Sequence, residues 1–300
     1  MKWKQFVELA WERYKIKCIP IDLEMKEFTE KCPYDLVIHK FTDELSDLPA
    51  QQPTIQKIER ILKQYPNLVE VDPLEHQKPV LDRLTLSHLL DKLNELPSEY
   101  AIRCPSYVTI EKEQDDYSGS LAKIKFPVVC KTIQACGSEE SHKMGIFFSE
   151  KELHQFKPPM LVQEYINHNA IIYKVFVIGS YLNIVHRKSL RNVTDNGNVI
   201  KKIIDNIFQK PLPSFLLPEK EYTQDMVQFP HKDILMAISN MIQKDLSLTL
   251  FGFDVITDVT TKKHAVVDLN YFPGYIGIDN FYSILLEHVL QVYRNKKQIK

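Results

Sequence analysis

The feature that most constrains the fold is a pair of apolar segments near the carboxyl end, each with an aspartate inside it. The segments are LFGFDVITD (250–258) and HAVVDLNYF (264–272), and a short polar loop centred near Thr261 separates them. Two runs of β-branched and aromatic residues joined in this way predict a β-hairpin. Since a buried strand disfavours charge, the aspartates need a physical reason to be there.

The register of this hairpin brings three polar residues together. In a symmetric pairing, residues whose numbers sum to 522 face each other, so Asp254 faces Asp268 and Gly252 faces Asn270, leaving room for a ligand. Because side chains alternate along a strand, Asp254, Asp268 and Asn270 share one face. Two carboxylates and an amide are the oxygen ligands that Mg²⁺ prefers, and Mg²⁺ between the carboxylates relieves their repulsion. The alternative is that one aspartate caps the turn and the other pairs with a lysine.

A metal held in this way indicates nucleotide polyphosphate chemistry, which requires local cations for the phosphates. Lys131 lies in the apolar strand FPVVCKT and Lys174 in IIYKVFVIG, where each is expected to face an anion. Arg187 lies in the other arm of the hairpin predicted at 171–190, whose first arm is IIYKVFVIG. Lys40 ends the strand YDLVIHK, where ligands gather in open α/β sheets. His142 lies in a polar loop. The alternatives are edge lysines that extend to solvent and a histidine without function.

Glycine is too scarce for the common nucleotide-binding loops. The chain has 8 glycines and none precedes residue 119, so neither a Walker A loop nor a GxGxxG fingerprint is present. The formal net charge is -1, which predicts no general attraction for nucleic acid. Any nucleotide must therefore be bound by another kind of fold.

The remaining composition predicts a cytoplasmic protein. No apolar run reaches the roughly 20 residues that a membrane crossing needs, and the amino end has no signal-peptide apolar core. The five cysteines are scattered without a CxxC pair, which argues against a structural zinc site. We expect no membrane and no nucleic acid among the partners, and a monomer.

The periodicity predicts an α/β chain of three domains, 1–83, 84–170 and 171–300. The first alternates helices with short strands at 16–23, 34–40 and 67–73, which predicts a parallel sheet. The second carries strands at 105–110, 126–132, 144–149 and 158–169, with a solvated stretch at 111–120. The third contains a hairpin at 171–190, loops at 192–202 and 205–224, a helix at 231–246, the acidic hairpin and a closing helix at 278–297.

Together these motifs resemble the inositol 1,3,4-trisphosphate 5/6-kinases, also called inositol-tetrakisphosphate 1-kinases, over nearly the whole chain. The motifs are HKFTD, VVCKT, ESHKM, LVQEYINHN, YKVFVIG, RKSL, LFGFDVI and VVDLNYFPGY. The resemblance implies the ATP-grasp fold, in which an N-terminal α/β domain precedes two domains that sandwich ATP. It implies an ATP-dependent kinase, with ATP as co-substrate and Mg²⁺ as cofactor, that phosphorylates a hydroxyl of soluble inositol tris- and tetrakisphosphates.

The resemblance also implies roles for individual residues. Mg²⁺ is expected on Asp254, Asp268 and Asn270, and inositol phosphate on Lys40, His142, Lys174 and Gly274. ATP is expected on Arg103, Lys131, Gln163, Glu164, Tyr165, Ile166, Asn167, His168, Asn169, Lys174 and Ser189. We assign the catalytic roles to Lys174, Asp268 and Arg187, of which Arg187 is our own addition as a phosphate contact.

The sequence departs from this family in two places. A loop that carries a His-Gly pair in animal members reads Cys136-Gly137 here. The family begins with a strand and a loop that bears a substrate-binding lysine, whereas this sequence opens on a helix, so the first strand is expected to be missing and inositol phosphate binding to be weaker. Two alternatives follow: an ATP-grasp ligase that activates a carboxylate, and a non-catalytic binder of nucleotide or inositol phosphate.

Overall fold

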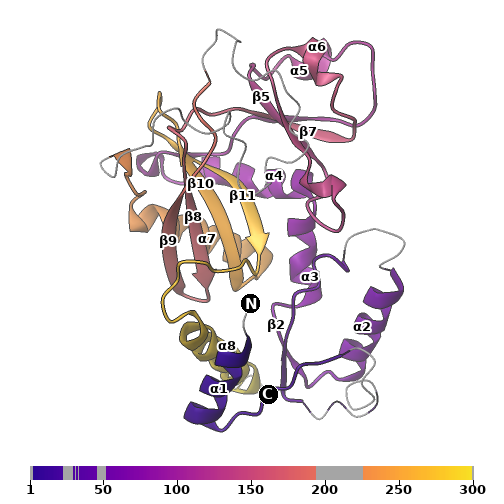
Figure 1. The fold of residues 1–300 in the computed structure, drawn as a ribbon, viewed down its shortest axis with the longest axis vertical. Coiled ribbons are helices and arrows are strands. Elements are labelled where there is room, and N and C mark those ends of the chain that lie inside the picture. The colour runs from indigo at the N-terminus through magenta and orange to yellow at the C-terminus, as the bar shows by residue number, and fades with distance from the viewer. Residues whose placement is uncertain are drawn as a thin grey trace.

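The computed structural model of this chain describes residues 3–22, 30, 32, 34–45, 52–193 and 226–298. The described residues contain three sheets, which have two, four and five strands. Figure 1 shows the four-stranded sheet at one end, the five-stranded sheet in the middle and the two-stranded sheet at the other end. The loop predicted at 192–202 lies outside the described residues from 194 on, and the loop predicted at 205–224 lies outside them entirely.

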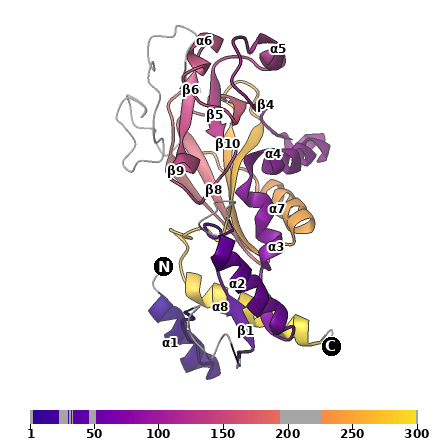
Figure 2. The same cartoon turned by 90° about the vertical axis from the view of Figure 1, so that its right-hand side faces the viewer.

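The N-terminal part pairs two short parallel strands, with Leu36 opposite Val69. The amphipathic segments predicted as helices are helical, and α1 packs against the C-terminal helix α8 (Figure 2). The strand predicted at 16–23 is wrong, because its described residues, 16–22, form no strand and belong to none of the three sheets. A strand requires a partner for its backbone hydrogen bonds, whatever its side-chain pattern. The elements are α1 (Trp3–Tyr14), β1 (Leu36–Ile38), α2 (Gln52–Gln64), β2 (Val69–Val71) and α8 (Phe281–Gln298).

The segment between β2 and the four-stranded sheet packs against the five-stranded sheet and adds one strand to it. Asp82 accepts a hydrogen bond of 2.6 Å from the Thr85 amide and so caps helix α4. Leu86 and Leu90 of α4 pack into the same core as the five-stranded sheet, and β3 pairs in parallel with β11. The elements are α3 (Leu74–Gln77), η2 (Lys78–Leu81), α4 (Arg83–Asp91), η3 (Lys92–Glu95), η4 (Ser98–Tyr100) and β3 (Ile102–Arg103).

The four-stranded sheet, in the order β4-β7-β5-β6, is antiparallel throughout. One face packs on a core that contains Tyr117, whose side chain is buried. The expectation of a solvated stretch at 111–120 is therefore wrong at Tyr117, which directly precedes the short helix Ser118–Leu121 that packs on the sheet. The elements are β4 (Tyr107–Ile110), α5 (Ser118–Leu121), β5 (Val128–Thr132), η5 (Glu140–His142), β6 (Met144–Phe147), α6 (Glu150–Leu153) and β7 (Met160–Glu164).

The five-stranded sheet, in the order β3-β11-β10-β8-β9, contains both predicted hairpins. Val175, Phe251 and Phe253 lie on the face opposite Lys174 and belong to the same core as the buried side of α7. The layers are visible in Figure 2, where α7 covers one side of the sheet. The elements are β8 (Ile171–Ile178), β9 (Tyr181–Lys188), α7 (Lys232–Leu246), β10 (Leu250–Thr257) and β11 (His264–Tyr271).

The predicted hairpin register is confirmed at the two pairs that carry the polar side chains. Asp254 is opposite Asp268 and Gly252 is opposite Asn270, but a bulge after Asp254 shifts the pairing by one residue toward the turn. Such a bulge twists the strands locally and re-aims side chains next to it. Of the helices in the described ranges, none combines the length and the apolar character that a membrane crossing needs.

Candidate active site

The acidic cluster is built by two neighbouring strands, β10 and β11. Asp254 and Asp268 are direct partners, and Asn270 donates a hydrogen bond of 2.8 Å from Nδ2 to Asp268 Oδ2. The prediction that these three residues share one face is therefore confirmed. The donor set suits Mg²⁺, because it offers two carboxylates and an amide oxygen. Within the described ranges, no three His, Cys, Asp or Glu side chains come together as an alternative metal site.

The expectation that Gly252 leaves room for a ligand is wrong. A Cβ atom at Gly252 would lie 3.0 Å from Pro273 Cγ and 3.1 Å from the Val175 carbonyl oxygen. The missing side chain is needed for close packing of the protein with itself rather than for a bound molecule. The glycine thus holds the segment after β11 close to the sheet and so fixes the position of the Pro-Gly turn.

Lys174 lies next to the acidic pair on β8. It is the cross-strand partner of Asp254, and its Nζ lies 2.6 Å from Asp254 Oδ2. Burial raises the pKa of Asp254 to about 6; the Lys174 ammonium opposes this shift, and the Asp268 carboxylate adds to it. Asp254 is buried beside a second carboxylate, and such a pair has an affinity for a cation.

Lys131 reaches the same cluster from the four-stranded sheet. Its Nζ donates to Gln163 Oε1 at 2.9 Å and to the Val267 carbonyl at 3.1 Å, so it spans from one sheet to the other. Burial lowers the pKa of this lysine to about 8, and the carboxylates of Asp268 and Asp254 oppose that shift. A buried cation beside two carboxylates is well placed to meet phosphate oxygens.

An apolar region adjoins the charged one. Ile166, Ile256 and Ala265 form a small buried cluster with the neighbouring Ile172 and Val267. Across from it, Val129 and Ile146 pack with partly buried side chains that include Tyr165. The site therefore has a charged end and an apolar end, which is the arrangement that a nucleotide with a planar base and a phosphate chain requires.

The connector Gln163–Asn169 is held by its own side chains. Tyr165 donates to the Arg191 carbonyl at 2.7 Å, and the side-chain amide of Asn167 exchanges hydrogen bonds of 2.8 and 2.7 Å with the Val193 backbone. His168 hydrogen-bonds Ser189 Oγ at 2.9 Å, and burial lowers its pKa, so the ring is neutral at pH 7. The contact with His168 brings Ser189 to the connector, and its role in ATP binding stays a prediction.

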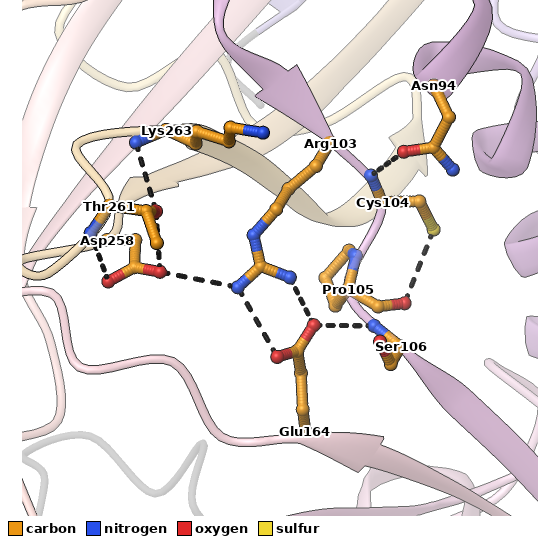
Figure 3. Close-up of polar contacts among 9 residues, drawn as sticks. All are labelled: Asn94, Arg103, Cys104, Pro105, Ser106, Glu164, Asp258, Thr261 and Lys263. Carbon is orange, nitrogen blue, oxygen red and sulfur yellow. Dashed lines mark hydrogen bonds and ion pairs between the residues drawn. The ribbon is translucent and has the colours of Figure 1, made fainter. Parts of the chain in front are cut away.

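Arg103 lies at the other end of the connector, away from the acidic cluster. Its guanidinium forms ion pairs with Glu164 and, at 3.4 Å, with Asp258 Oδ2 (Figure 3). In the structure the guanidinium of Arg103 is therefore paired with two protein carboxylates. Its role in ATP binding stays a prediction.

Two of the predicted substrate-binding residues, Lys40 and Gly274, lie at the segment after β11, together with Arg187. Lys40 Nζ donates to the Phe272 carbonyl at 3.3 Å, although 232 residues separate the two. Arg187 Nη2 donates to the Ile276 carbonyl at 3.1 Å, and Gly274 is exposed in the turn between them. The structure therefore brings Lys40, Gly274 and Arg187 to one segment. The side chain of His142 lies outside the described residues.

Sequence reasoning missed Arg83, which organises the polar loop 134–143. Its buried guanidinium donates to the Thr132 and Gln134 carbonyls at 2.8 and 2.7 Å and to the Ser141 carbonyl at 3.1 Å. Burial lowers the pKa of Arg83, and the Asp268 carboxylate opposes this shift. The only sign of this role in the sequence is an arginine at the first position of an amphipathic helix.

A separate hollow of about 390 Å³, lined by α2, β2 and α8, contains none of the predicted site residues.

Comparison with protein families identifies one matching model. Residues 97–291 match the family described as the inositol 1,3,4-trisphosphate 5/6-kinase ATP-grasp domain. The chain is 30% identical to an inositol-tetrakisphosphate 1-kinase of Xenopus laevis, over 99% of this chain and 77% of that protein. It is 32% identical to the protein of the same name from Danio rerio, over 99% of this chain and 76% of that one.

Solved structures resemble the fold at low sequence identity. A D-alanine–D-alanine ligase of Bacillus anthracis, solved in complex with ATP, matches with a TM-score of 0.56 and 16% identity, covering 100% of this chain and 96% of that one. A D-alanyl-alanine synthetase A of Vibrio cholerae matches with a TM-score of 0.54 and 14% identity, covering 88% of this chain and 77% of that one. These likenesses show the ATP-grasp architecture and nothing further.

Proposed function

The chain belongs to the inositol 1,3,4-trisphosphate 5/6-kinase family with an ATP-grasp fold, and from that premise we propose how its residues transfer a phosphoryl group to an inositol polyphosphate. It is an ATP-dependent kinase that acts on inositol phosphates. The observation that carries the proposal is the acidic pair Asp254–Asp268, which lies between Lys174 from its own sheet and Lys131 from the facing one. The acceptor is a hydroxyl of a soluble tris- or tetrakisphosphate.

Mg²⁺ fits the oxygen atoms of Asp254, Asp268 and Asn270. When bound, it neutralises phosphate charge and orients the phosphate chain. The support is the shared strand face and the raised pKa of Asp254, since a carboxylate that is costly to ionise alone gains most from a nearby cation. Asn270 holds Asp268 through its amide nitrogen and keeps its own oxygen available as a ligand.

Three cations act on the transferring group. Lys131 holds the phosphates from the four-stranded sheet, while Lys174 and Arg187 stabilise the equatorial charge from the five-stranded sheet. Lys174 and Arg187 lie on the same face as Asp254, because Lys174 is opposite both Asp254 and Val185, and Arg187 is two residues after Val185 on β9. Asp268 orients the acceptor hydroxyl in addition to its role as a ligand. Positioning and charge neutralisation then account for most of the acceleration.

ATP binds across the junction of the two sheets. The connector, with Gln163, Glu164, Tyr165, Ile166, Asn167, His168 and Asn169, holds the adenine with its backbone, and Arg103 and Ser189 complete this side of the site. The support is the apolar cluster next to the connector and the network that fixes the connector's side chains, so that its backbone is held in one position.

The inositol phosphate binds beyond the γ-phosphate, on Lys40, His142, Lys174 and Gly274. The support is the contact between Lys40 and the segment after β11, which brings the N-terminal part next to the turn that holds Gly274. The monomeric state and the cytoplasmic location are part of the same proposal. The latter is consistent with five free cysteines.

Product analysis by NMR tests this proposal. The purified chain is incubated with ATP, Mg²⁺ and a panel of inositol tris- and tetrakisphosphates, and the phosphorylated position is read from the spectra. We expect one added phosphate on a ring hydroxyl. Because the structural neighbours are ligases, a parallel reaction with hydroxylamine and carboxylic acids checks for an acyl phosphate. Hydroxamate without inositol phosphate product favours a ligase, and ATP binding without any product favours a binder.

A further inference from the structure

The two chain segments that connect the sheets lie side by side. The first, 104–106, runs from β3 of the five-stranded sheet to β4 of the four-stranded sheet, and the second, 165–170, returns from β7 to β8. The Glu164 amide donates to the Ser106 carbonyl at 2.9 Å, and the Ser106 amide donates to Glu164 Oε1 at 2.6 Å. Any rotation of one sheet against the other therefore has to bend the chain at Ser106 and Glu164.

Arg103 bridges the two sheets at this point. The arginine comes from β3, Glu164 ends β7 of the four-stranded sheet, and Asp258 follows β10 of the five-stranded sheet. Figure 3 shows the guanidinium between the two carboxylates. The three side chains are 21%, 24% and 12% exposed, so the cluster is largely removed from water.

Asp258 is itself fixed in place. Its Oδ1 accepts a hydrogen bond of 2.8 Å from the Thr260 amide, and its Oδ2 accepts one of 2.8 Å from Thr261 Oγ1. The Val259 amide donates to the Asn167 carbonyl at 2.9 Å, which ties the turn after β10 to the connector. Asp258 is thus a rigid anchor, and the arginine transmits its position to Glu164 at the start of the connector.

We propose that Arg103 is a positioning residue that clamps the hinge between the two sheets and so fixes the connector for adenine. This inference rests on the proposed ATP site and changes the role of one residue in it: Arg103 acts through Glu164 and Asp258 and makes no contact with ATP. Both terminal nitrogens are engaged by carboxylates, and the buried Nε has no partner among the described residues. Reaching a phosphate would require the loss of both ion pairs.

The consequence is a selective effect on ATP. Loss of the clamp leaves the lysines and the acidic cluster in place but lets the connector shift relative to the five-stranded sheet. The affinity for ATP then falls, while the KM for the inositol phosphate stays unchanged. For a partly exposed, charge-assisted pair we expect roughly a 3- to 10-fold weakening of ATP binding.

A double-mutant cycle on the full chain tests the clamp. The variants are Arg103→Gln, Glu164→Gln and the double substitution, with Lys92→Gln as a control that removes the exposed 3.0 Å pair with Asp245. The dissociation constant for ATP is measured by calorimetry, and the KM for ATP and for inositol phosphate by initial rates. We expect each single variant to weaken ATP binding and the double variant to weaken it no further than Arg103→Gln alone, because the arginine substitution already removes the contact with Glu164. The control should bind ATP like the unmodified chain.

Two results would overturn the clamp. If Arg103→Gln weakens ATP binding but Glu164→Gln leaves it unchanged or tighter, the arginine contacts ATP directly. If the variants lower the melting temperature without changing the ATP dissociation constant, the role is only structural. Should Arg103→Gln fail to fold, Glu164→Gln and Asp258→Asn each remove one of the two ion pairs of Arg103, and each should weaken ATP binding. ATP binding does not require the acceptor. If the variants change ATP binding as expected but the chain phosphorylates no inositol phosphate, only the proposed function is refuted.

Discussion

Lys131 gives the sharpest prediction, because its charge is both necessary and costly. Its ammonium is buried between the sheets and, within the part of the chain that the structure describes, donates to the Gln163 side chain and the Val267 carbonyl. Burial lowers its pKa to about 8, so the free enzyme loses this charge under mildly alkaline conditions. Neutral lysine holds phosphate far less well than the ammonium does.

The magnitude follows from the titration. With a pKa of about 8, roughly 90% of Lys131 is charged at pH 7 and roughly 10% at pH 9. Since kcat/KM reports the pKa of the free enzyme, kcat/KM for ATP should fall about tenfold between these two values. The kcat at saturating ATP should fall less, because the phosphates of bound ATP stabilise the ammonium and raise its pKa.

The assay is a set of initial rates from pH 6 to pH 10 at ATP concentrations well below KM and at saturation. The variant Lys131→Arg serves as the control, since a guanidinium stays charged over the whole range and should move the alkaline limb upward. A kcat/KM for ATP that stays flat to pH 9.5 in the unmodified chain would refute the reasoning. So would an alkaline limb that is identical in the two proteins.

Three further predictions concern the support of the site. Burial lowers the pKa of His288 to about 4, below the usual 6.5, so its contribution to the free energy of unfolding is present above pH 6.5 and is lost as the pH falls. Urea unfolding should show a loss of about 2 kcal/mol between pH 7 and pH 5, and His288→Asn should remove that pH dependence. The buried carboxylate of Asp72 accepts three hydrogen bonds at the start of β10, so Asp72→Asn should lower the free energy of unfolding by about 2 kcal/mol, and a loss below 0.5 kcal/mol would contradict it. Gly252→Ala should cost about 1–3 kcal/mol, whereas Gly119→Ala, which meets no atom within 4 Å, should cost nothing; equal melting temperatures would refute the packing argument.

Local sequence patterns were sufficient where a segment carried its own periodicity. The alternation in the acidic hairpin predicts the pairing of Asp254 with Asp268, and the structure confirms it. The spacing of Phe6, Val7, Ala10, Trp11 and Tyr14 likewise predicts a helix, and α1 spans Trp3–Tyr14. In both cases the residues that decide the structure are neighbours in the sequence, so the pattern contains the required information.

Prediction failed where the outcome depends on distant partners. The residues at 16–22 have the composition of a strand but no strand to pair with in the described part of the chain. The packing of Pro273 and Val175 against Gly252, and the carbonyls that surround Arg83, become visible only when the chain is folded. Polar side chains that stabilise loops through hydrogen bonds to the backbone occur at no regular spacing, so the sequence pattern does not identify them.

The most direct test of the account is the transfer of labelled phosphate from [γ-³²P]ATP to an inositol tetrakisphosphate by the unmodified chain and by Asp268→Asn. We predict a labelled inositol phosphate that depends on added Mg²⁺, and a loss of at least about 100-fold in the variant, which still folds and binds nucleotide. The account is contradicted if the unmodified chain binds ATP but labels no inositol phosphate. It is equally contradicted if Asp268→Asn transfers the label at the unmodified rate.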